Sequence, residues 1–246
     1  MDSLSPVETY LESTRKPQRA QTHHRPSSAR IEVEKGEVYG QCLRAQFYSW
    51  KNEPETNPPD LSGLFNFYMG HIIEDMYEEG LKLEKKNYTR EYPFQVDIGL
   101  KNILSARMDF IMHEEGKDYG VELKTGYGQG ISRTKAKGLP KENYILQMML
   151  YYKYCPLNPY KIENPTYARD SFYRLPFVLI GRDDGTFTIG SHKGFRDIPW
   201  TCDMLLESWV KLEDYLKTDT LPPKDYQGTW NCNYCAYRDK CKGEVK

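Results

Sequence analysis

The stretch that decides the fold is Ser105-Ala-Arg-Met-Asp-Phe-Ile-Met-His-Glu-Glu-Gly-Lys-Asp-Tyr-Gly-Val-Glu-Leu-Lys-Thr-Gly126. Polar and apolar residues alternate over 107–113 and again over 119–125, which is the pattern of two half-buried β-strands. The link 114–118 combines charged residues with a glycine, and this composition is typical of a turn. The stretch therefore predicts a β-hairpin with one face toward a core.

The polar face of this hairpin gathers three charged side chains. Glu122 and Lys124 are two positions apart in a strand, so they share a face. If the hairpin is symmetric about Glu115-Gly116, Asp109 lies opposite Glu122, and directly paired residues have Cβ atoms about 4.5–5.5 Å apart. Carboxylate oxygens are ligands that Mg²⁺ prefers, and a bound metal ion can activate water for phosphodiester cleavage. The spacing alone more often marks a solvated hairpin face with an ordinary Glu–Lys pair.

Two helices on either side of the hairpin carry further polar residues. Residues 61–85 read as a helix with an apolar stripe, and His71 lies within it. Residues 143–154 read as a second helix, in which Gln147 and Tyr151 are four apart and share a face. By themselves, a lone histidine and a Gln–Tyr pair at this spacing most often belong to ordinary packing. The stripe of the first helix comprises Leu64, Phe65, Tyr68, Ile72, Met76 and Leu83.

A basic loop follows the hairpin directly. Residues 125–141 hold four glycines and a proline, and their cations are Arg133, Lys135, Lys137 and Lys141. Cations next to a phosphodiester-cleaving site can neutralise the phosphates of a nucleic acid strand. We therefore expect these four residues to bind DNA, with a solvated loop as the alternative.

Three of the six cysteines lie together near the end of the chain. Cys232, Cys235 and Cys241 have the spacing C-x2-C-x5-C, which supplies three ligands, and Cys42 is the natural fourth. Four thiolates suffice for zinc or for an iron–sulfur cluster. The other two cysteines, at 155 and 202, have no ligand spacing and are expected to be buried thiols.

The sequences Ala-Arg-Met-Asp-Phe-Ile (106–111) and Val-Glu-Leu-Lys-Thr-Gly (121–126) resemble the core of the RecB-like branch of the PD-(D/E)xK nuclease superfamily, although many members have glycine where this chain has Ala106. The resemblance implies a restriction-endonuclease-like α/β core, with a central mixed sheet flanked by helices and a C-terminal iron–sulfur segment. The implied catalytic residues are Asp109, Glu122, Lys124, Gln147 and Tyr151. The implied metal-binding residues are His71, Asp109, Glu122 and Leu123.

The cysteine pattern is similar to that of the CRISPR-associated Cas-four exonucleases and of related helicase–nuclease subunits. That likeness implies a [4Fe–4S] cluster on Cys42, Cys232, Cys235 and Cys241. It also implies an Mg²⁺- or Mn²⁺-dependent exonuclease acting on single-stranded DNA in CRISPR spacer processing, phage recombination or repair. The implied partners are CRISPR adaptation proteins or a recombination or helicase protein. The alternative is a DNA-binding iron–sulfur module of a larger complex, without catalysis.

Composition and length set the remaining expectations. The net charge of −1 gives no overall basic field, so DNA contacts must come from local patches. No run approaches the roughly 20 apolar residues of a membrane span, and no secretory signal opens the chain, so we expect a cytoplasmic protein. Residues 1–30 are basic and polar, which predicts a flexible arm. Residues 31–246 then form a single nuclease domain, in which 228–246 closes onto Cys42.

Overall fold

The computed structural model describes residues 6–33, 36–127, 132, 141–157, 166–167, 177–181, 187–189, 198–226 and 230–243. Its elements are α1 (Pro6–Ser13), η1 (Pro26–Ser28), β1 (Arg30–Glu32), β2 (Val38–Gly40), α2 (Leu43–Trp50), α3 (Leu61–Leu83), β3 (Tyr88–Val96), β4 (Leu104–Glu114), β5 (Lys117–Gly126), α5 (Glu142–Tyr154), β6 (Thr166–Tyr167), β7 (Phe177–Gly181), β8 (Phe187–Ile189), β9 (Ile198–Thr201), α7 (Cys202–Thr218), α8 (Trp230–Asn233) and α9 (Arg238–Gly243).

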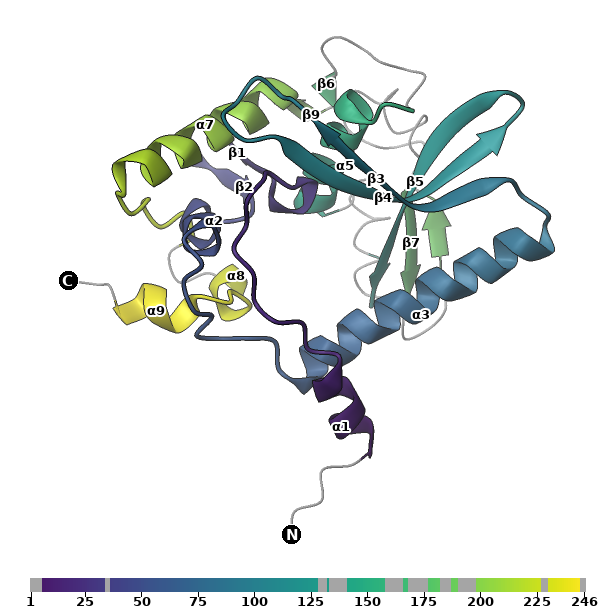
Figure 1. Cartoon of the computed structure of the whole chain (residues 1–246), viewed down its shortest axis with the longest axis horizontal. Coiled ribbons are helices and arrows are strands. Elements are labelled where there is room, and N and C mark those ends of the chain that lie inside the picture. Colours follow the sequence, from purple (N-terminus) through teal and green to yellow (C-terminus); the bar gives the residue numbers. More distant parts are fainter. Residues whose placement is uncertain are drawn as a thin grey trace.

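A five-stranded sheet in the order β3-β4-β5-β7-β8 forms the centre of the protein (Figure 1). The strands β3, β4 and β5 pair antiparallel, β5 pairs parallel with β7, and β7 pairs antiparallel with β8. The sheet is therefore mixed, and the chain has the α/β class that the sequence predicts. Two small two-stranded sheets, β1–β2 and β6–β9, lie outside it.

The hairpin β4–β5 has the register predicted from its sequence. Phe110 pairs with Val121, which is the predicted register, and the ladder ends there, so Asp109 and Glu122 lie directly beyond its last pair. The turn lies at Glu115-Gly116, and both residues have positive φ, at 52° and 75°. A two-residue turn of this kind matches the twist of paired strands and favours glycine at the second position.

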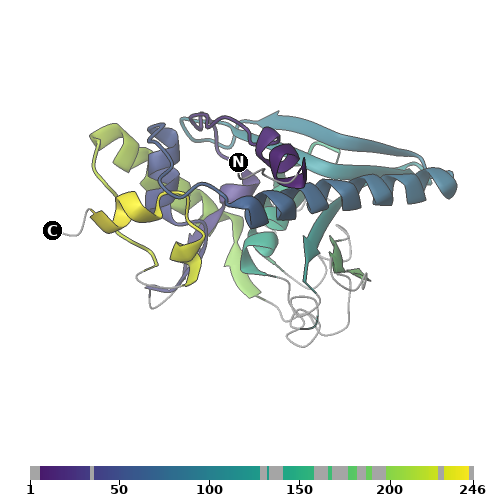
Figure 2. The ribbon, with the colours of Figure 1, turned by 90° about the horizontal axis from the view of Figure 1, so that it is seen from below.

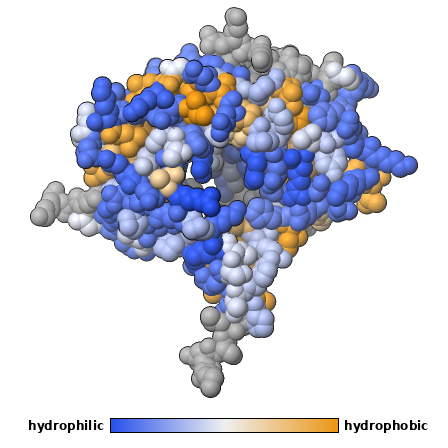
Figure 3. All heavy atoms as spheres, viewed as in Figure 1, coloured by the Kyte–Doolittle hydropathy of each residue, from blue (hydrophilic) through white to orange (hydrophobic). Residues whose placement is uncertain are grey.

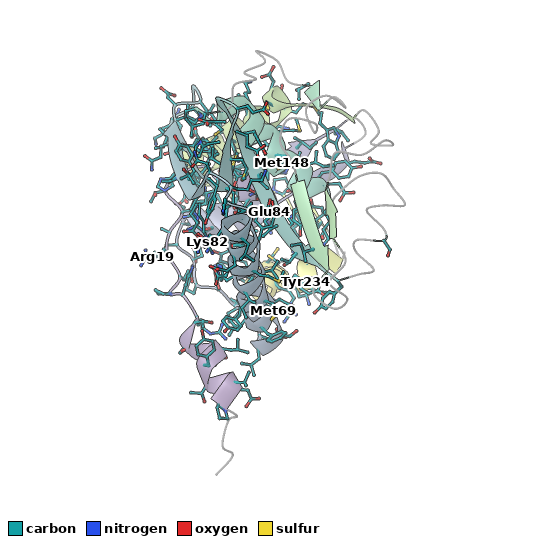
Figure 4. All side chains as sticks on the ribbon, turned by 90° about the vertical axis from the view of Figure 1, so that its right-hand side faces the viewer. Arg19, Met69, Lys82, Glu84, Met148 and Tyr234 are labelled. Atoms are coloured by element: carbon teal, nitrogen blue, oxygen red, sulfur yellow. The ribbon has the colours of Figure 1, made fainter. Side chains whose placement is uncertain are left out.

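Helices cover both faces of the sheet (Figure 2). On one face, α3 packs through Ile73 and Leu81 against Phe110 and Val121. On the other face, α5 packs through Met148 and Tyr151 against a second apolar layer. In the side view of Figure 4, Lys82 and Glu84 mark the C-terminal end of α3. The two helices thus enclose the strands that carry Asp109 and Glu122.

The buried face of α3 differs from the apolar stripe predicted for it. The stripe members Phe65, Ile72, Met76 and Leu83 are exposed. The residues of α3 that are buried are Leu64, Ile73 and Leu81. The helix carries apolar residues on two sides, and Gly70 lies on the side next to the sheet. An added Cβ there would lie 3.9 Å from the hydroxyl of Thr125 in β5.

Residues 21–30 pack into the core, so the prediction of a flexible arm is wrong for this segment. The imidazole of His24 is fully buried and stacks on Trp209 of α7 at 4.6 Å between ring centroids. The main chain of His24 also pairs with the central sheet, through a parallel bridge to Leu104 at the start of β4. Arg30 is buried as well, in an ion pair described below. Polar residues can be buried in this way when each finds a charged or hydrogen-bonding partner.

Apolar residues recur at helical spacing over 36–50 and 198–217, which predicts a helix in each range. The structure forms β2 and then α2 in the first range, and β9 and then α7 in the second. The sequence of 171–191 predicts one or two outer strands with a turn at 183–185; β7 and β8 lie in this range, and the turn lies outside the described residues. In the parts of the chain that the structure describes, no helix is long and apolar enough to cross a bilayer. Figure 3 shows a largely hydrophilic face that is hollowed near its centre.

Candidate functional site

Glu122 is the centre of a buried polar cluster on the α5 side of the sheet. Its side chain is only 1% exposed, and Lys124 donates a hydrogen bond to its Oε1. The two side chains share a face because they are two residues apart in β5. The predicted Glu–Lys pair is therefore present, but it is buried and is not a solvated hairpin face.

Gln147 and Tyr151 reach this cluster from α5, one turn apart. The amide nitrogen of Gln147 donates to Oε1 of Glu122 at 2.7 Å and to the hydroxyl oxygen of Tyr151 at 2.8 Å. The hydroxyl of Tyr151 in turn donates to the carbonyl of Arg107 in β4, at 2.9 Å. This chain of hydrogen bonds ties the helix to both strands and fixes one oxygen of Glu122.

Asp109 lies where β4 and β5 separate. Their ladder ends at the Phe110–Val121 pair, and β5 pairs with β7 from Glu122 onward. The carboxylate of Asp109 takes the place of the missing ladder contact, because its Oδ2 accepts the main-chain N–H of Leu123 at 2.8 Å. The side chain of Leu123 is buried in the opposite apolar layer. Leu123 therefore takes part in the site through its main chain.

Burial makes the ionised forms of these carboxyls unfavourable. Loss of solvent raises the pKa of Glu122 to about 8, and the charge of Asp109 adds to this increase. Burial also raises the pKa of Asp109, although Lys124 acts against it. The pKa of Lys124 is raised because the attraction of Glu122 and Asp109 outweighs its loss of solvent. Two carboxyls with raised pKa values beside one cation are typical of functional sites.

The donor set suits a divalent cation. Oε2 of Glu122 is buried without a hydrogen-bond partner, and such an atom is costly unless something binds it. Within the described ranges, no three His, Cys, Asp or Glu side chains are grouped closely enough to hold a metal ion. Asp109 and Glu122 would therefore need main-chain, water or substrate oxygens to complete a shell, which is usual for Mg²⁺.

Two charged residues near this cluster were not identified as site residues from the sequence. The charge of Glu74 in α3 raises the pKa of both Asp109 and Glu122, so its carboxylate lies near them. Arg107 lowers the pKa of Asp109 from the other side and pairs with Glu91 at 3.1 Å. The signal for Glu74 was its position one turn after His71 on the same side of the helix.

His71 lies at the margin of the site. Its side chain is 57% exposed, and its Nδ1 is 3.5 Å from Oε2 of Glu74. The imidazole therefore contacts Glu74, and Glu74 in turn lies near the carboxyls of Asp109 and Glu122.

The basic residues predicted to bind DNA fall mostly outside the described part of the chain. Arg133, Lys135 and Lys137 lie among residues that the structure does not describe. Lys141 immediately precedes α5, and its Nζ lies 5.8 Å from the ring centroid of Tyr144. The Nζ of Lys124 is 5.6 Å from the same ring. A half-exposed tyrosine between two lysines thus borders the carboxylate cluster.

The four cysteines proposed as ligands belong to the chain around α2, α8 and α9, and these three helices lie on the same side of the protein (Figure 1). Cys42, Cys235 and Cys241 pack against the same apolar core. Burial raises the pKa of Cys235, and the charges of Cys42, Cys241 and Cys232 add to this increase, so the four thiols lie in one region. Among the described residues they are not grouped closely enough to hold a metal ion. Cys155 and Cys202 are buried elsewhere, as expected, and burial raises the pKa of Cys202 to about 12.

The surroundings of Cys42 act on its thiol in two opposite directions. Cys42 is the residue before the first turn of α2, and hydrogen bonds from the main chain of Ala45 and Arg44 act to lower the pKa of its thiol, although burial outweighs them. The N-terminus of a helix stabilises negative charge in this way. Soft thiolates are the ligands that zinc and iron–sulfur clusters use. The four thiols therefore have the chemistry that zinc or an iron–sulfur cluster needs, and they would have to move closer together to bind either one.

The C-terminal cysteine segment is held by main-chain contacts with residues 52–60. The N–H groups of Thr56 and Asn57 both donate to the carbonyl of Ala236, and the side chain of Asn57 donates to the carbonyl of Cys235 at 3.1 Å. The ring of Tyr237 packs on Tyr48 of α2. The predicted closure of this segment onto the region of Cys42 is consistent with these contacts.

Comparison with known proteins shows the fold alone. No family model and no curated protein matches the chain. Among solved structures, the crystal structure of SSO0001 is similar, with a TM-score of 0.53 and 16% sequence identity over 98% of this chain and 95% of that chain. The two chains therefore share an architecture over nearly their whole lengths.

Proposed function

We propose that the protein is a metal-dependent deoxyribonuclease with its active site at Asp109, Glu122 and Lys124. One observation carries the proposal: Glu122 is buried and has an unpartnered oxygen, in a cluster that joins Lys124 and Gln147. The RecB-like sequence pattern independently assigns the same residues to cleavage of phosphodiester bonds. The [4Fe–4S] cluster on the four cysteines is part of the same proposal.

The two carboxylates would hold the metal ion, and the neighbouring residues fix the orientation of Glu122. When bound, Mg²⁺ or Mn²⁺ would make a bound water more acidic and stabilise the leaving oxygen. Gln147 orients Glu122 by binding its Oε1, and Tyr151 orients Gln147. The ammonium of Lys124 is placed to offset the charge of a scissile phosphate. Its raised pKa keeps it protonated at neutral pH, so it acts as a cation and not as a base.

The substrate is proposed to be DNA, with single strands preferred. Lys141 can neutralise a phosphate, and the ring of Tyr144 beside it offers a face on which a base can stack. Neither contact reads the edge of a base, so little sequence preference is expected. CRISPR adaptation, phage recombination and repair are the settings proposed from sequence resemblance, with a protein of that setting as partner.

A DNA-binding module without catalysis is the alternative. It gives no reason to bury two carboxyls with raised pKa values, because such groups weaken the fold and repel a phosphate. The deciding experiment is digestion of end-labelled single-stranded DNA with and without Mg²⁺, for the wild type and for Asp109→Ala, Glu122→Ala and Lys124→Ala. We expect metal-dependent cleavage that each substitution abolishes while far-UV circular dichroism is unchanged. Wild-type cleavage by all three variants would remove the proposed site.

A further inference from the structure

Arg30 occupies an unusual position for an arginine, because its side chain is only 3% exposed. Its Nε donates to Oδ2 of Asp225 at 2.9 Å and its Nη2 donates to Oδ1 at 2.6 Å. Its Nη1 donates to the hydroxyl of Ser208 at 3.1 Å. The pair is thus a two-pronged contact in which the guanidinium and the carboxylate fix each other's orientation.

The same carboxylate also holds the start of α2. Oδ2 of Asp225 accepts the main-chain N–H of Leu43, the residue after Cys42, at 2.7 Å. The next residue, Tyr226, donates from its hydroxyl to the carbonyl of Gly40 at 2.7 Å. The carbonyl of Tyr226 accepts a hydrogen bond from the thiol of Cys232 at 2.7 Å. A short segment therefore contacts both the chain around Cys42 and Cys232.

Stability alone does not account for this ion pair. Replacing a buried ion pair by apolar residues of similar size is often neutral or stabilising, because two charges are costly to remove from water. What an apolar pair could not supply is the hydrogen bond to Leu43. The charge of Cys42 is among those that raise the pKa of Arg30, which places the guanidinium close to that thiol.

We propose that Arg30 and Asp225 are positioning residues for the four-cysteine site, and that they hold the start of α2, and with it Cys42, beside the segment that binds Cys232. This inference rests on the proposed presence of the cluster. It is separate from the proposed nuclease chemistry, since neither residue touches the carboxylate cluster. Contacts of this kind around metal ligands typically contribute about 10- to 100-fold to metal retention.

The test compares iron retention in variants of the full chain purified without oxygen. The main variant combines Arg30→Met with Asp225→Leu, so that no unpaired charge is left buried. Ser208→Ala is the matched control, because it removes one hydrogen bond of Arg30 and keeps the contact between Asp225 and Leu43. Arg30→Lys is a second variant that keeps the charge but loses the two-pronged geometry. Iron per chain and its rate of transfer to a chelator are measured beside far-UV circular dichroism.

We expect the double variant to fold and to lose iron about 10- to 100-fold faster than the wild type, with Arg30→Lys between them and Ser208→Ala unchanged. Wild-type iron release from a folded double variant would overturn the inference and leave the cluster proposal intact. If the double variant does not fold, the inference is tested on Arg30→Lys instead. Iron release from Arg30→Lys at the wild-type rate would then overturn the inference. A wild-type protein without iron would overturn the cluster proposal and this inference with it, whatever the outcome of DNA digestion.

Discussion

Replacing Glu122 by glutamine should stabilise the protein while abolishing cleavage. Glutamine keeps the size of the side chain and can accept the hydrogen bonds from Lys124 and Gln147 at its amide oxygen. It removes a carboxyl whose pKa burial raises from 4.5 to about 8. That increase already includes the favourable attraction of Lys124, so it measures the net penalty of ionising this group in the fold.

The pH dependence follows from the two pKa values. Below pH 4.5 the carboxyl is protonated in the folded and unfolded chains, so the variant gains little. Between pH 4.5 and pH 8 only the unfolded chain releases the proton, so the free energy of unfolding of the wild type falls as pH rises. At about 1.4 kcal/mol per pKa unit, the advantage of the variant is about 3 kcal/mol at pH 7 and about 5 kcal/mol above pH 8.

The measurement is urea unfolding of both proteins without added divalent cation, followed by far-UV circular dichroism at about pH 5 and about pH 8.5. Glu213→Gln is the matched control. Hydrogen bonds from His24 and Asn102 lower the pKa of Glu213 despite its burial, so this variant should be less stable than wild type by nearly the same amount at both pH values, because the difference is lost only below about pH 4.5. An advantage of Glu122→Gln that does not grow with pH would refute the reasoning. Added Mg²⁺ should stabilise the wild type and leave Glu122→Gln unaffected, because only the wild type keeps the carboxylate pair.

Three further outcomes are expected. In protein purified without oxygen, Cys42→Ser should lose iron and sulfide while Cys155→Ser keeps them, because only Cys42 neighbours the C-terminal thiols; stoichiometric zinc without iron in the wild type would contradict this. Lys141→Ala should flatten the salt dependence of single-stranded DNA binding without changing the metal requirement, since a phosphate contact contributes chiefly through counterion release. Tyr151→Phe should slow cleavage about 10-fold or more, which corresponds to an increase of about 1.4 kcal/mol in the activation free energy, because Gln147 loses its hydrogen-bond partner. Its stability should change little, and an unchanged cleavage rate would show that Gln147 needs no such support.

The hairpin and its charged face were predictable because both depend on local rules. Alternation fixes which side chains share a face, and the Glu115-Gly116 turn fixes the register. These two rules are enough to place Asp109 and Glu122 directly beyond the Phe110–Val121 pair that ends the ladder. They do not predict that Glu122 is buried, because its burial depends on α5 packing over β5. The polar partners of Glu122 on that helix were assigned from resemblance alone.

The polar core around residues 21–30 was not predictable from local composition. His24 contacts Glu213 across 189 residues of sequence, and Arg30 contacts Asp225 across 195. Each side chain alone is typical of a solvated segment, and only the partner makes burial tolerable. Similarly, α3 has apolar residues on two sides, and the contact with the sheet determines which of them is buried. The periodicity of apolar residues along the sequence does not indicate which residues far apart in the chain contact one another.

The helix α5 links the cysteine site to the carboxylate cluster. Ile145 and Leu146 pack in the same apolar core as Cys42, and Gln147 on another side of the helix binds Glu122. The chain before Cys42 is tightly confined: Gly40 has φ +93°, and an added Cβ would lie 2.8 Å from Leu146 Cδ1. We therefore expect movement of the chain around Cys42 to reach α5 at Leu146, the residue before Gln147 of the proposed active site.

Loss of the cluster should accordingly impair cleavage at a distance. Cys42→Ser, although it removes no group of the carboxylate cluster, should cleave DNA more slowly than wild type yet faster than Asp109→Ala, because the catalytic groups remain but α5 is less firmly held. The assay is single-turnover cleavage at saturating Mg²⁺, with Cys155→Ser as the control for loss of a buried thiol. An iron-free, folded Cys42→Ser protein that cleaves at the wild-type rate would show that α5 keeps its place without the cysteine site, and that the two centres are independent.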